Sequence, residues 1–108
     1  MTVKELAEKY SVEVLSLPAP DREVSGGYCG DLLSWVMGRA EADNAWITIM
    51  TNVNIVAVAA LTDVAVIIIA EGARPDENVI CTAKEKGINI LLTEDTAYNM
   101  AVKISKDI

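Results

Sequence analysis

The chain has 108 residues, of which 52% are apolar, and its 9 basic and 16 acidic side chains give a net charge of −7 at pH 7. A chain of this length and hydrophobicity is expected to form one domain, residues 1–108, with a core of its own. The acidic balance argues against nucleic acid and anionic membrane surfaces as partners, because phosphate binding depends on clustered Lys and Arg. Histidine is absent, which excludes Ser-His and Cys-His nucleophiles, His-ligated zinc and imidazole acid–base catalysis.

Two further sequence features bear on location. Cys29 and Cys81 stand far apart, so neither a disulfide framework nor a Cys-x-x-Cys site is predicted, and both are expected to be buried thiols of a reduced protein. The uncharged run over residues 44–62 is interrupted by asparagines and ends before Asp63, which disfavours a membrane helix. With no secretory leader at its start, the chain is expected to be a soluble cytoplasmic protein.

The first part of the chain predicts a helix, a strand, a glycine turn and a second helix. Residues 2–10 read as an amphipathic helix with a capping box formed by Thr2 and Glu5. A short strand over residues 12–15 ends at two prolines. A turn at Ser25-Gly26-Gly27 then precedes a helix that Asp31 is expected to cap and that runs to about residue 40. Its inward side chains are expected to be Leu32, Trp35 and Val36.

From residue 45 onward strands and helices alternate. The expected strands are 45–50, 64–70 and 88–92, and the expected helices are 53–61, 76–86 and a last one capped by Thr93 or Asp95. The strands over 64–70 and 88–92 lack polar alternation, which is typical of strands covered on both faces. The pattern therefore predicts an α/β fold in layers, with a mainly parallel sheet flanked by helices.

The stretch over residues 25–30 is a near match to the dinucleotide motif G-x-G-x-x-G, with Ser25 in the place of the first glycine. It follows an irregular segment, and the acidic residue expected about 20 positions later is missing, so a dinucleotide site is disfavoured. No P-loop motif is present. Neighbouring carboxylates near helix ends read as solvated caps, and Asp63 reads either as a cap after the helix over 53–61 or as the partner of a buried donor.

A second group of polar residues follows the expected strands. Asn52 and Asn54 come after the strand over 45–50, and Glu71-Gly72 and Thr93 come at the ends of the next two. Open α/β sheets bind ligands at this edge, so these residues would ring one polar crevice. The alternative is that the asparagines only cap a helix and Gly72 only turns the chain.

The pattern D-R-x-x-S-G-G over residues 21–27 resembles the motif of the DRTGG domain family, with Ser25 where the family name has Thr. The stretches 30–37, 51–54 and 70–72 are also similar to that family, and the likeness extends over nearly the whole chain, as in a free-standing copy. The resemblance implies a fold similar to the N-terminal domain of HPr kinase/phosphorylase. Related domains in phosphate acetyltransferase-like proteins and between the CBS domains of regulatory pyrophosphatases imply a regulatory or dimerising role, with catalysis elsewhere.

The leading functional hypothesis is a non-catalytic regulatory or protein-interaction module that acts on a partner protein, with no cofactor, no metal and no catalytic residue. The alternative is a sensor of a small molecule, a nucleotide or another anion, that uses the Gly26-Gly27 turn and the crevice at the strand ends. A small enzyme that uses Asp, Glu, Lys or Cys is the third hypothesis. The candidate ligand or interaction residues are Asp21, Arg22, Ser25, Gly26, Gly27, Asn52, Asn54, Glu71, Gly72 and Thr93.

Two structural expectations accompany these hypotheses. Arg22 is expected to bind Asp21 or nearby backbone carbonyls and so to hold the glycine turn in shape. The helix over 53–61 is apolar nearly all round, and the helix after the glycine turn adds Leu33, Trp35 and Met37. This surplus of apolar surface predicts a homodimer, unless the first helix or the segment over 12–17 covers it.

Overall fold

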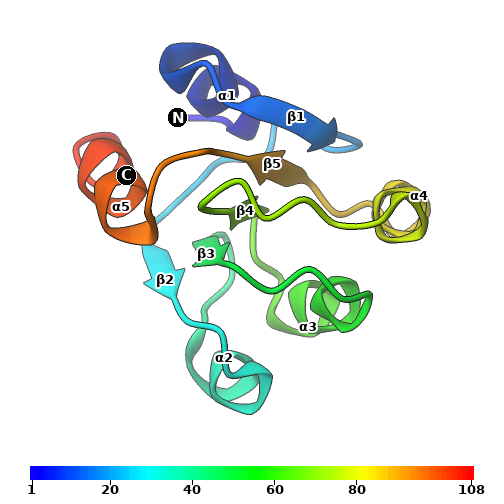
Figure 1. Cartoon of the computed structure of the whole chain (residues 1–108). Coiled ribbons are helices and arrows are strands. Elements are labelled where there is room, and N and C mark those ends of the chain that lie inside the picture. The colour runs from blue at the N-terminus through cyan, green and yellow to red at the C-terminus, as the bar shows by residue number, and fades with distance from the viewer.

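Five strands form a single mixed sheet in the order β1-β5-β4-β3-β2 (Figure 1). Strands β2 to β5 are parallel, and β1 pairs with β5 in the antiparallel direction at one edge. The computed structural model covers residues 1–108. Its elements are α1 (Val3–Tyr10), β1 (Glu13–Ser16), β2 (Gly27–Cys29), α2 (Leu33–Arg39), β3 (Ala45–Thr48), α3 (Asn54–Thr62), β4 (Val66–Ile69), α4 (Glu77–Lys86), β5 (Ile90–Leu92) and α5 (Ala97–Ile104).

Helices cover both faces of this sheet, as the alternation of apolar strands and helices predicts. Helices α2, α3 and α4 lie on one face, and α1 and α5 lie on the other (Figure 1). Every residue of β3, β4 and β5 is buried, because each of these strands has a strand on either side and helices above and below. The core is therefore divided by the sheet into two clusters, one centred on Trp46, Ile67 and Ile69 and the other on Ile47, Ile68 and Met100. The predicted α/β fold is confirmed.

Helix α1 begins as its sequence predicts. Thr2 and Glu5 form a reciprocal capping box, with hydrogen bonds of 2.8 and 3.1 Å. The N–H groups of Val3 and Lys4, which no helix can satisfy internally, donate at 3.0 Å to the carbonyl oxygens of Arg22 and Pro20. The start of α1 is thus fixed to a segment that lies almost twenty residues further along the chain.

That segment, which we call the strap (residues 17–26), crosses the whole width of the sheet. Strand β1 lies at one edge and β2 at the other, so the strap passes the first residues of β5, β4 and β3 on its way (Figure 1). Asn89, just before β5, holds it by accepting from the Ala19 N–H at 3.0 Å and donating to the Ala19 carbonyl at 2.8 Å. The same amide donates to the Ala65 carbonyl at 3.0 Å.

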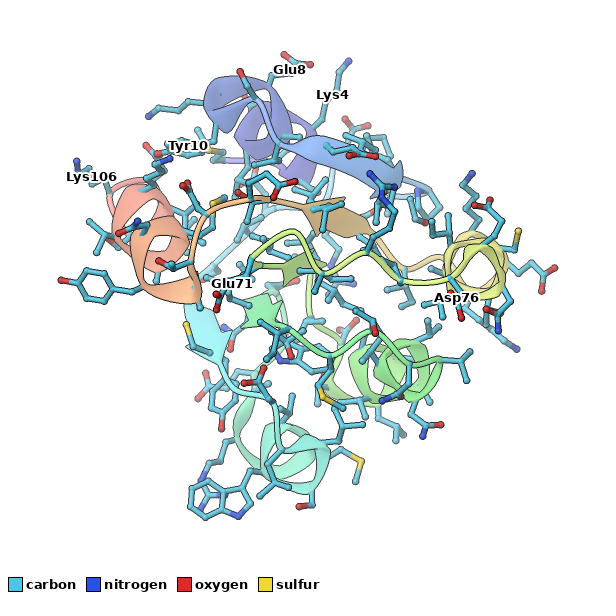
Figure 2. All side chains as sticks on the ribbon, in the orientation of Figure 1. Lys4, Glu8, Tyr10, Glu71, Asp76 and Lys106 are labelled. Carbon is cyan, nitrogen blue, oxygen red and sulfur yellow. The ribbon has the colours of Figure 1, made fainter.

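Helices α1 and α5 are joined at their outer ends by Tyr10, which lies between them (Figure 2). Its hydroxyl donates to the Lys103 carbonyl at 2.7 Å and to the carboxylate of Asp107. The Asp107 carboxylate also accepts from Lys9, and these bonds, from Lys9 first and from Tyr10 second, lower its pKa below the usual value. In contrast, the nearby Lys4, Glu8 and Lys106 point away from the molecule (Figure 2).

Several local predictions differ from the structure. Helix α2 starts at Leu33 without a side-chain cap, because the Asp31 carboxylate accepts instead from the Thr48 hydroxyl and the Ile49 N–H at 2.8 and 2.9 Å. Of the residues expected to point inward, only Val36 is buried, whereas Leu32 and Trp35 are exposed. The last helix is capped by Thr96, since the Thr93 hydroxyl accepts from Asp95 N–H in the preceding turn.

The expectation that both cysteines are buried is also wrong. Cys29 lies on the outer edge strand β2, and Cys81 lies on the exposed side of α4, so both thiols are free and exposed. The uncharged run over residues 44–62 divides between β3 and α3, and no helix of the chain has both the length and the apolar character to span a membrane.

The hydrogen bonds of Asn89 predict a large stability cost when its side chain is truncated. Asn89 is 2% exposed, and Asn89→Ala leaves the Ala19 and Ala65 groups without their partners. We expect the free energy of unfolding to fall by about 2–4 kcal/mol, measured by urea denaturation. Asn99→Ala, on the exposed side of α5, is the matched control and should change it by less than about 0.5 kcal/mol. Equal effects of the two substitutions would contradict this role of Asn89.

Candidate functional site

The candidate residues fall into two groups at opposite ends of the strands. Because β2 to β5 are parallel, all residues that precede these strands lie at their amino ends, and all residues that follow them lie at their carboxyl ends. The strap residues Asp21, Arg22, Ser25 and Gly26 belong to the first group, together with Gly27 at the start of β2. Asn52, Asn54, Glu71, Gly72 and Thr93 belong to the second. A single pocket therefore cannot use both groups.

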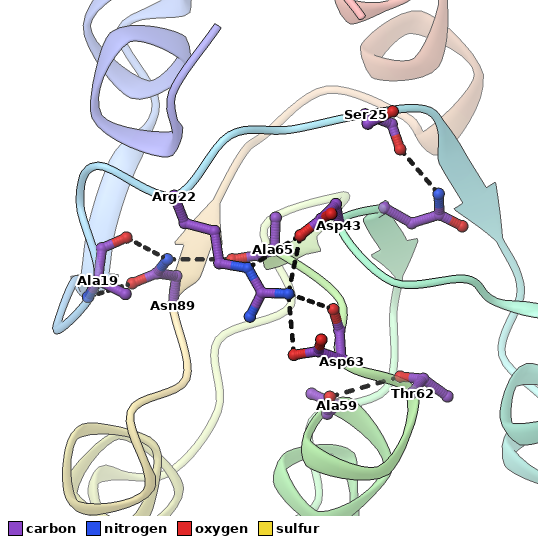
Figure 3. Close-up of polar contacts among 10 residues, drawn as sticks. Ala19, Arg22, Ser25, Asp43, Ala59, Thr62, Asp63, Ala65 and Asn89 are labelled. Carbon is purple, nitrogen blue, oxygen red and sulfur yellow. Dashed lines mark hydrogen bonds and ion pairs between the residues drawn. The ribbon is translucent and has the colours of Figure 1, made fainter.

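Arg22 is central to the group at the amino ends of the strands, where its guanidinium joins the strap to the loops before β3 and β4 (Figure 3). Its Nε and Nη2 donate to Asp43 Oδ1 at 3.2 and 2.9 Å. Nη2 also donates to the Asp63 carbonyl at 2.5 Å and lies 2.9 Å from Asp63 Oδ1. The expected bond to Asp21 is not formed, so the guanidinium acts on remote loops and not on its own turn.

The two aspartates that hold Arg22 share an unusual backbone conformation. Asp43 and Asp63 both have left-handed φ angles, 68° and 59°, and Asp63 ends α3. Burial opposes the charge of Arg22, but the hydrogen bonds that it donates to Asp43 and Asp63 outweigh this effect and raise the pKa of the guanidinium. Asp63 thus serves both as the helix end and as the partner of a donor, the two alternatives that the sequence left open.

The glycine turn does not have the form of a phosphate-binding loop. Gly26 has a φ of 72°, and its successor Gly27 already begins strand β2, so three strand residues separate the turn from the approach to α2. The Ser25 N–H donates to the Asp43 carbonyl at 2.8 Å, and the Ser25 carbonyl accepts from the Asn44 amide at 2.9 Å. These backbone groups are occupied by the protein itself and do not cradle an anion.

At the carboxyl ends of the strands, the loop after β4 contacts the loop after β5. Glu71 and Gly72 have φ angles of 59° and 67°, and their N–H groups donate to the carbonyls of Asp95 and Thr93 at 2.8 and 2.9 Å. The Glu94 carboxylate lies over the Cα of Gly72, in the space that a side chain would fill. The crevice expected between these strand ends is therefore closed by main-chain bonds and by Glu94.

Asn52 and Asn54, which follow the carboxyl end of β3, have a local role. Asn52 accepts from the Asn54 N–H at 2.9 Å and thereby shapes the turn that starts α3. The alternative interpretation, in which they serve the helix start, accounts for this contact. They line neither of the two cavities of the molecule.

One cavity of about 270 Å³ opens near the carboxyl end of β5, between α1, β1 and the loop after β5. Of the candidate residues it includes only Thr93, and three carboxylates line it: Glu13, Glu94 and Asp95. Arg74 lies beside it but is held by Glu13, with Nη2 at 2.6 and 2.7 Å from the two carboxylate oxygens, and this bond raises the pKa of Arg74. No group of three or more Cys, Asp or Glu residues is arranged to hold a metal ion.

Exposed apolar side chains lie on α2, beside the edge strand β2, and on the neighbouring α3 (Figure 1). Leu32, Trp35 and Met37 are 61%, 54% and 49% exposed, and α2 contains no acidic residue. Arg39, its single charge, stacks 3.8 Å from the centre of the Trp35 ring. Val53 and Leu61 are the exposed apolar residues of the α3 region. We call these five apolar residues the α2/α3 surface.

The contacts of Arg22 predict that its first role is structural. Arg22→Ala removes charge-assisted hydrogen bonds from two partly buried loops, and we expect the free energy of unfolding to fall by about 1–3 kcal/mol. Arg22→Lys should recover only part of the loss, because one ammonium cannot reproduce the planar fork. Arg74→Ala breaks an exposed ion pair and should leave thermal unfolding nearly unchanged. If Arg22→Ala melts like the natural chain, the strap does not depend on this side chain.

Comparison with known proteins places the chain in a family. The model of the DRTGG domain family matches residues 29–106, which include the stretches 30–37, 51–54 and 70–72 but not residues 21–27. A solved structure of similar fold is that of the CBS and DRTGG domains of the regulatory region of Clostridium perfringens pyrophosphatase, complexed with the activator diadenosine tetraphosphate.

That structure has a TM-score of 0.70 and 15% sequence identity to this chain, so the likeness concerns the fold. The match covers 94% of this chain and 44% of the other, which means that this chain corresponds to less than half of the pyrophosphatase region. No curated protein matches the chain in sequence. Since the family model spans most of its length, the chain belongs to the DRTGG domain family.

Proposed function

We propose that this protein is a non-catalytic regulatory module that works by binding protein, in the first place a second copy of itself. The observation that carries the proposal is the α2/α3 surface, where apolar side chains stand in water without a cover. Exposed apolar surface concentrated in one place is typical of association sites and uncommon on monomers. The similar fold within a regulatory region of a pyrophosphatase supports the regulatory role.

The polar groups of the molecule support a role without catalysis. The guanidinium groups of Arg22 and Arg74 are each bound by carboxylates of the chain itself. The partial burial of the largely exposed Cys29 thiol, and to a smaller extent the charge of Asp31, raises its pKa, which weakens it as a nucleophile. Catalytic groups need pKa values and positions that suit a bound substrate, whereas these groups are engaged in contacts that hold the fold. The likeness to the HPr kinase/phosphorylase domain stays a prediction.

The α2/α3 surface predicts concentration-dependent association that polar substitutions abolish. We expect the natural chain to dimerise at micromolar concentration and Leu32→Ser/Trp35→Ser to be monomeric, because the substitutions replace most of the apolar surface of α2. Light scattering and sedimentation velocity measure both. Val14→Thr, at the opposite edge of the sheet, is the control and should keep the mass of the natural chain. A double variant that dimerises as well as the natural chain would move the association site elsewhere.

A second candidate function is a sensor of a nucleotide or another anion, favoured by the cavity of about 270 Å³ at the carboxyl ends of the strands. The bound diadenosine tetraphosphate of the pyrophosphatase region gives this candidate a specific ligand to test. The electrostatics do not favour it, because Arg74 and Lys103 are already bound by Glu13 and Asp95, and Glu94 adds an unpaired carboxylate to the lining. We therefore give priority to protein association.

This order of preference predicts that diadenosine tetraphosphate leaves the melting temperature unchanged. The cavity offers a polyphosphate no unpaired cation, and Glu94 repels it, so no binding is expected at 1 mM ligand. That concentration would add about 2.7 kcal/mol if it were 100 times the Kd. Differential scanning fluorimetry with and without the ligand checks this. A saturable rise in melting temperature that Thr93→Val removes would establish the sensor instead.

A further inference from the structure

Strand β2 offers an open edge of the sheet. It pairs with β3 on one side only, and no other element covers its outer side, where it lies between α5 and α2 (Figure 1). The Gly26 carbonyl and the Gly30 N–H bond to β3 at 3.0 and 3.1 Å. Because alternate residues of a strand direct their backbone groups to the same side, the N–H and C=O groups of Gly27 and Cys29 point outward.

A groove of about 290 Å³ runs along the same strand, between it and α5. It exists because the residues that β2 presents to this face are Gly27, which has no side chain, and the small Cys29. None of its lining residues has a charged side chain: Gly26, Gly27, Tyr28, Cys29, Ile47, Ala101, Ile104, Ser105 and Ile108. An open strand edge beside an apolar groove is the arrangement that proteins use to add a further strand.

We propose that the occupant of this edge is β2 of a second copy, paired in the antiparallel direction about a twofold axis; this inference rests on the proposed function and adds its geometry. Gly27 then lies opposite the partner's Cys29, and both pairs of outward backbone groups exchange hydrogen bonds. Tyr28 lies opposite the partner's Tyr28 in the pair without hydrogen bonds. The two sheets join into one, with the same face of each copy on the same side.

Charge supports a second copy as the occupant. Two chains of net charge −7 repel each other, so their contact must avoid carboxylates. Strand β2, helix α2 and the groove contain none of the 16 acidic residues. In the proposed register, Asp31 lies opposite the partner's Ser25, so the two copies of Asp31 do not face each other. At this end of the sheet two copies can approach without bringing carboxylate side chains of β2, α2 or the groove into contact.

The flanking helices supply the area that the short strand lacks. A stable interface buries about 800 Å² on each partner, more than three strand residues can contribute. The twofold axis brings α2 towards the partner's α2 on one face of the joined sheet and α5 towards the partner's α5 on the other. The exposed Leu32 and Trp35 of α2 and Tyr98 of α5, the last 77% exposed, then gain a cover. One geometry thus covers exposed apolar residues of the α2 and α5 regions, on both faces of the sheet.

The first test removes one outward donor of the edge. Cys29→Pro deletes the N–H that would bond the partner but takes nothing from the ladder with β3, and proline is tolerated on edge strands. We expect Cys29→Pro to be monomeric by sedimentation velocity at concentrations where Cys29→Ser, its matched control, is dimeric. Circular dichroism and thermal melting show whether the proline variant is folded. A folded Cys29→Pro that still dimerises overturns the strand pairing and leaves the proposed function in place.

The second test uses the natural chain and does not depend on any variant. Cys29 and Cys81 are both exposed in a single copy, but only Cys29 lies at the proposed contact. Alkylation with N-ethylmaleimide at fixed pH should slow at Cys29 as the protein concentration rises through the dimer range, while Cys81 reacts at a constant rate. Dimerisation without protection of Cys29 overturns the inference alone. A chain that stays monomeric at every concentration overturns this inference and the proposed self-association together.

Discussion

The fold depends on how the chain passes from one edge of its sheet to the other. Strands β1 and β2 are consecutive in sequence but lie at opposite edges, so the strap must cross the starts of β5, β4 and β3. Hydrogen bonds from Arg22, Asn44 and Asn89 hold it to these loops, and its own carbonyls satisfy the start of α1. Only Val24 of the strap is buried, so these hydrogen bonds supply much of what fixes its path along the strand ends.

This crossing also separates the two kinds of surface. At the amino ends of the parallel strands, Arg22 and the backbone of Ser25 are occupied with structural contacts. At the carboxyl ends, Glu71, Gly72 and Glu94 close the space between the loops after β4 and β5. The surface whose groups have no partner within the chain is formed by β2, α2 and the side of α5 that borders β2. Its groups are apolar side chains and backbone donors and acceptors, which suit another polypeptide better than a charged metabolite.

The sequence predicted the elements well where hydrophobic periodicity is strong, and less well where one polar side chain decides. The buried strands around Ile47, Ile68 and Leu91 and the capping box of α1 follow from local pattern. Asp31 could not be assigned from sequence, because its carboxylate chooses the Thr48 hydroxyl of a neighbouring strand over the start of α2. Leu32 and Trp35 were expected inside because apolar character alone does not tell which face of a seven-residue helix meets the sheet.

The candidate site shows the same limit. The sequence singled out Arg22 but not its partners Asp43 and Asp63, which come from loops about 20 and 40 residues away and whose role depends on strand order. Asp43, Asn44 and Asn89 share one signal that could have been used: each is a polar residue just before a buried strand, where backbone groups of a crossing segment need partners. Arg74 gave no comparable signal, because its bond to Glu13 arises only from the antiparallel placement of β1.

The position of β1 has a consequence for the order in which the chain can fold. Glu13 finds its partner in Leu92, so β1 has no strand to pair with until β5 has been synthesised. The parallel strands from β2 onward can assemble one after another as the chain emerges, each with its helix. From this topology we expect β1 to join the sheet late, and to be among the segments most exposed to proteases and chaperones while the protein is being made.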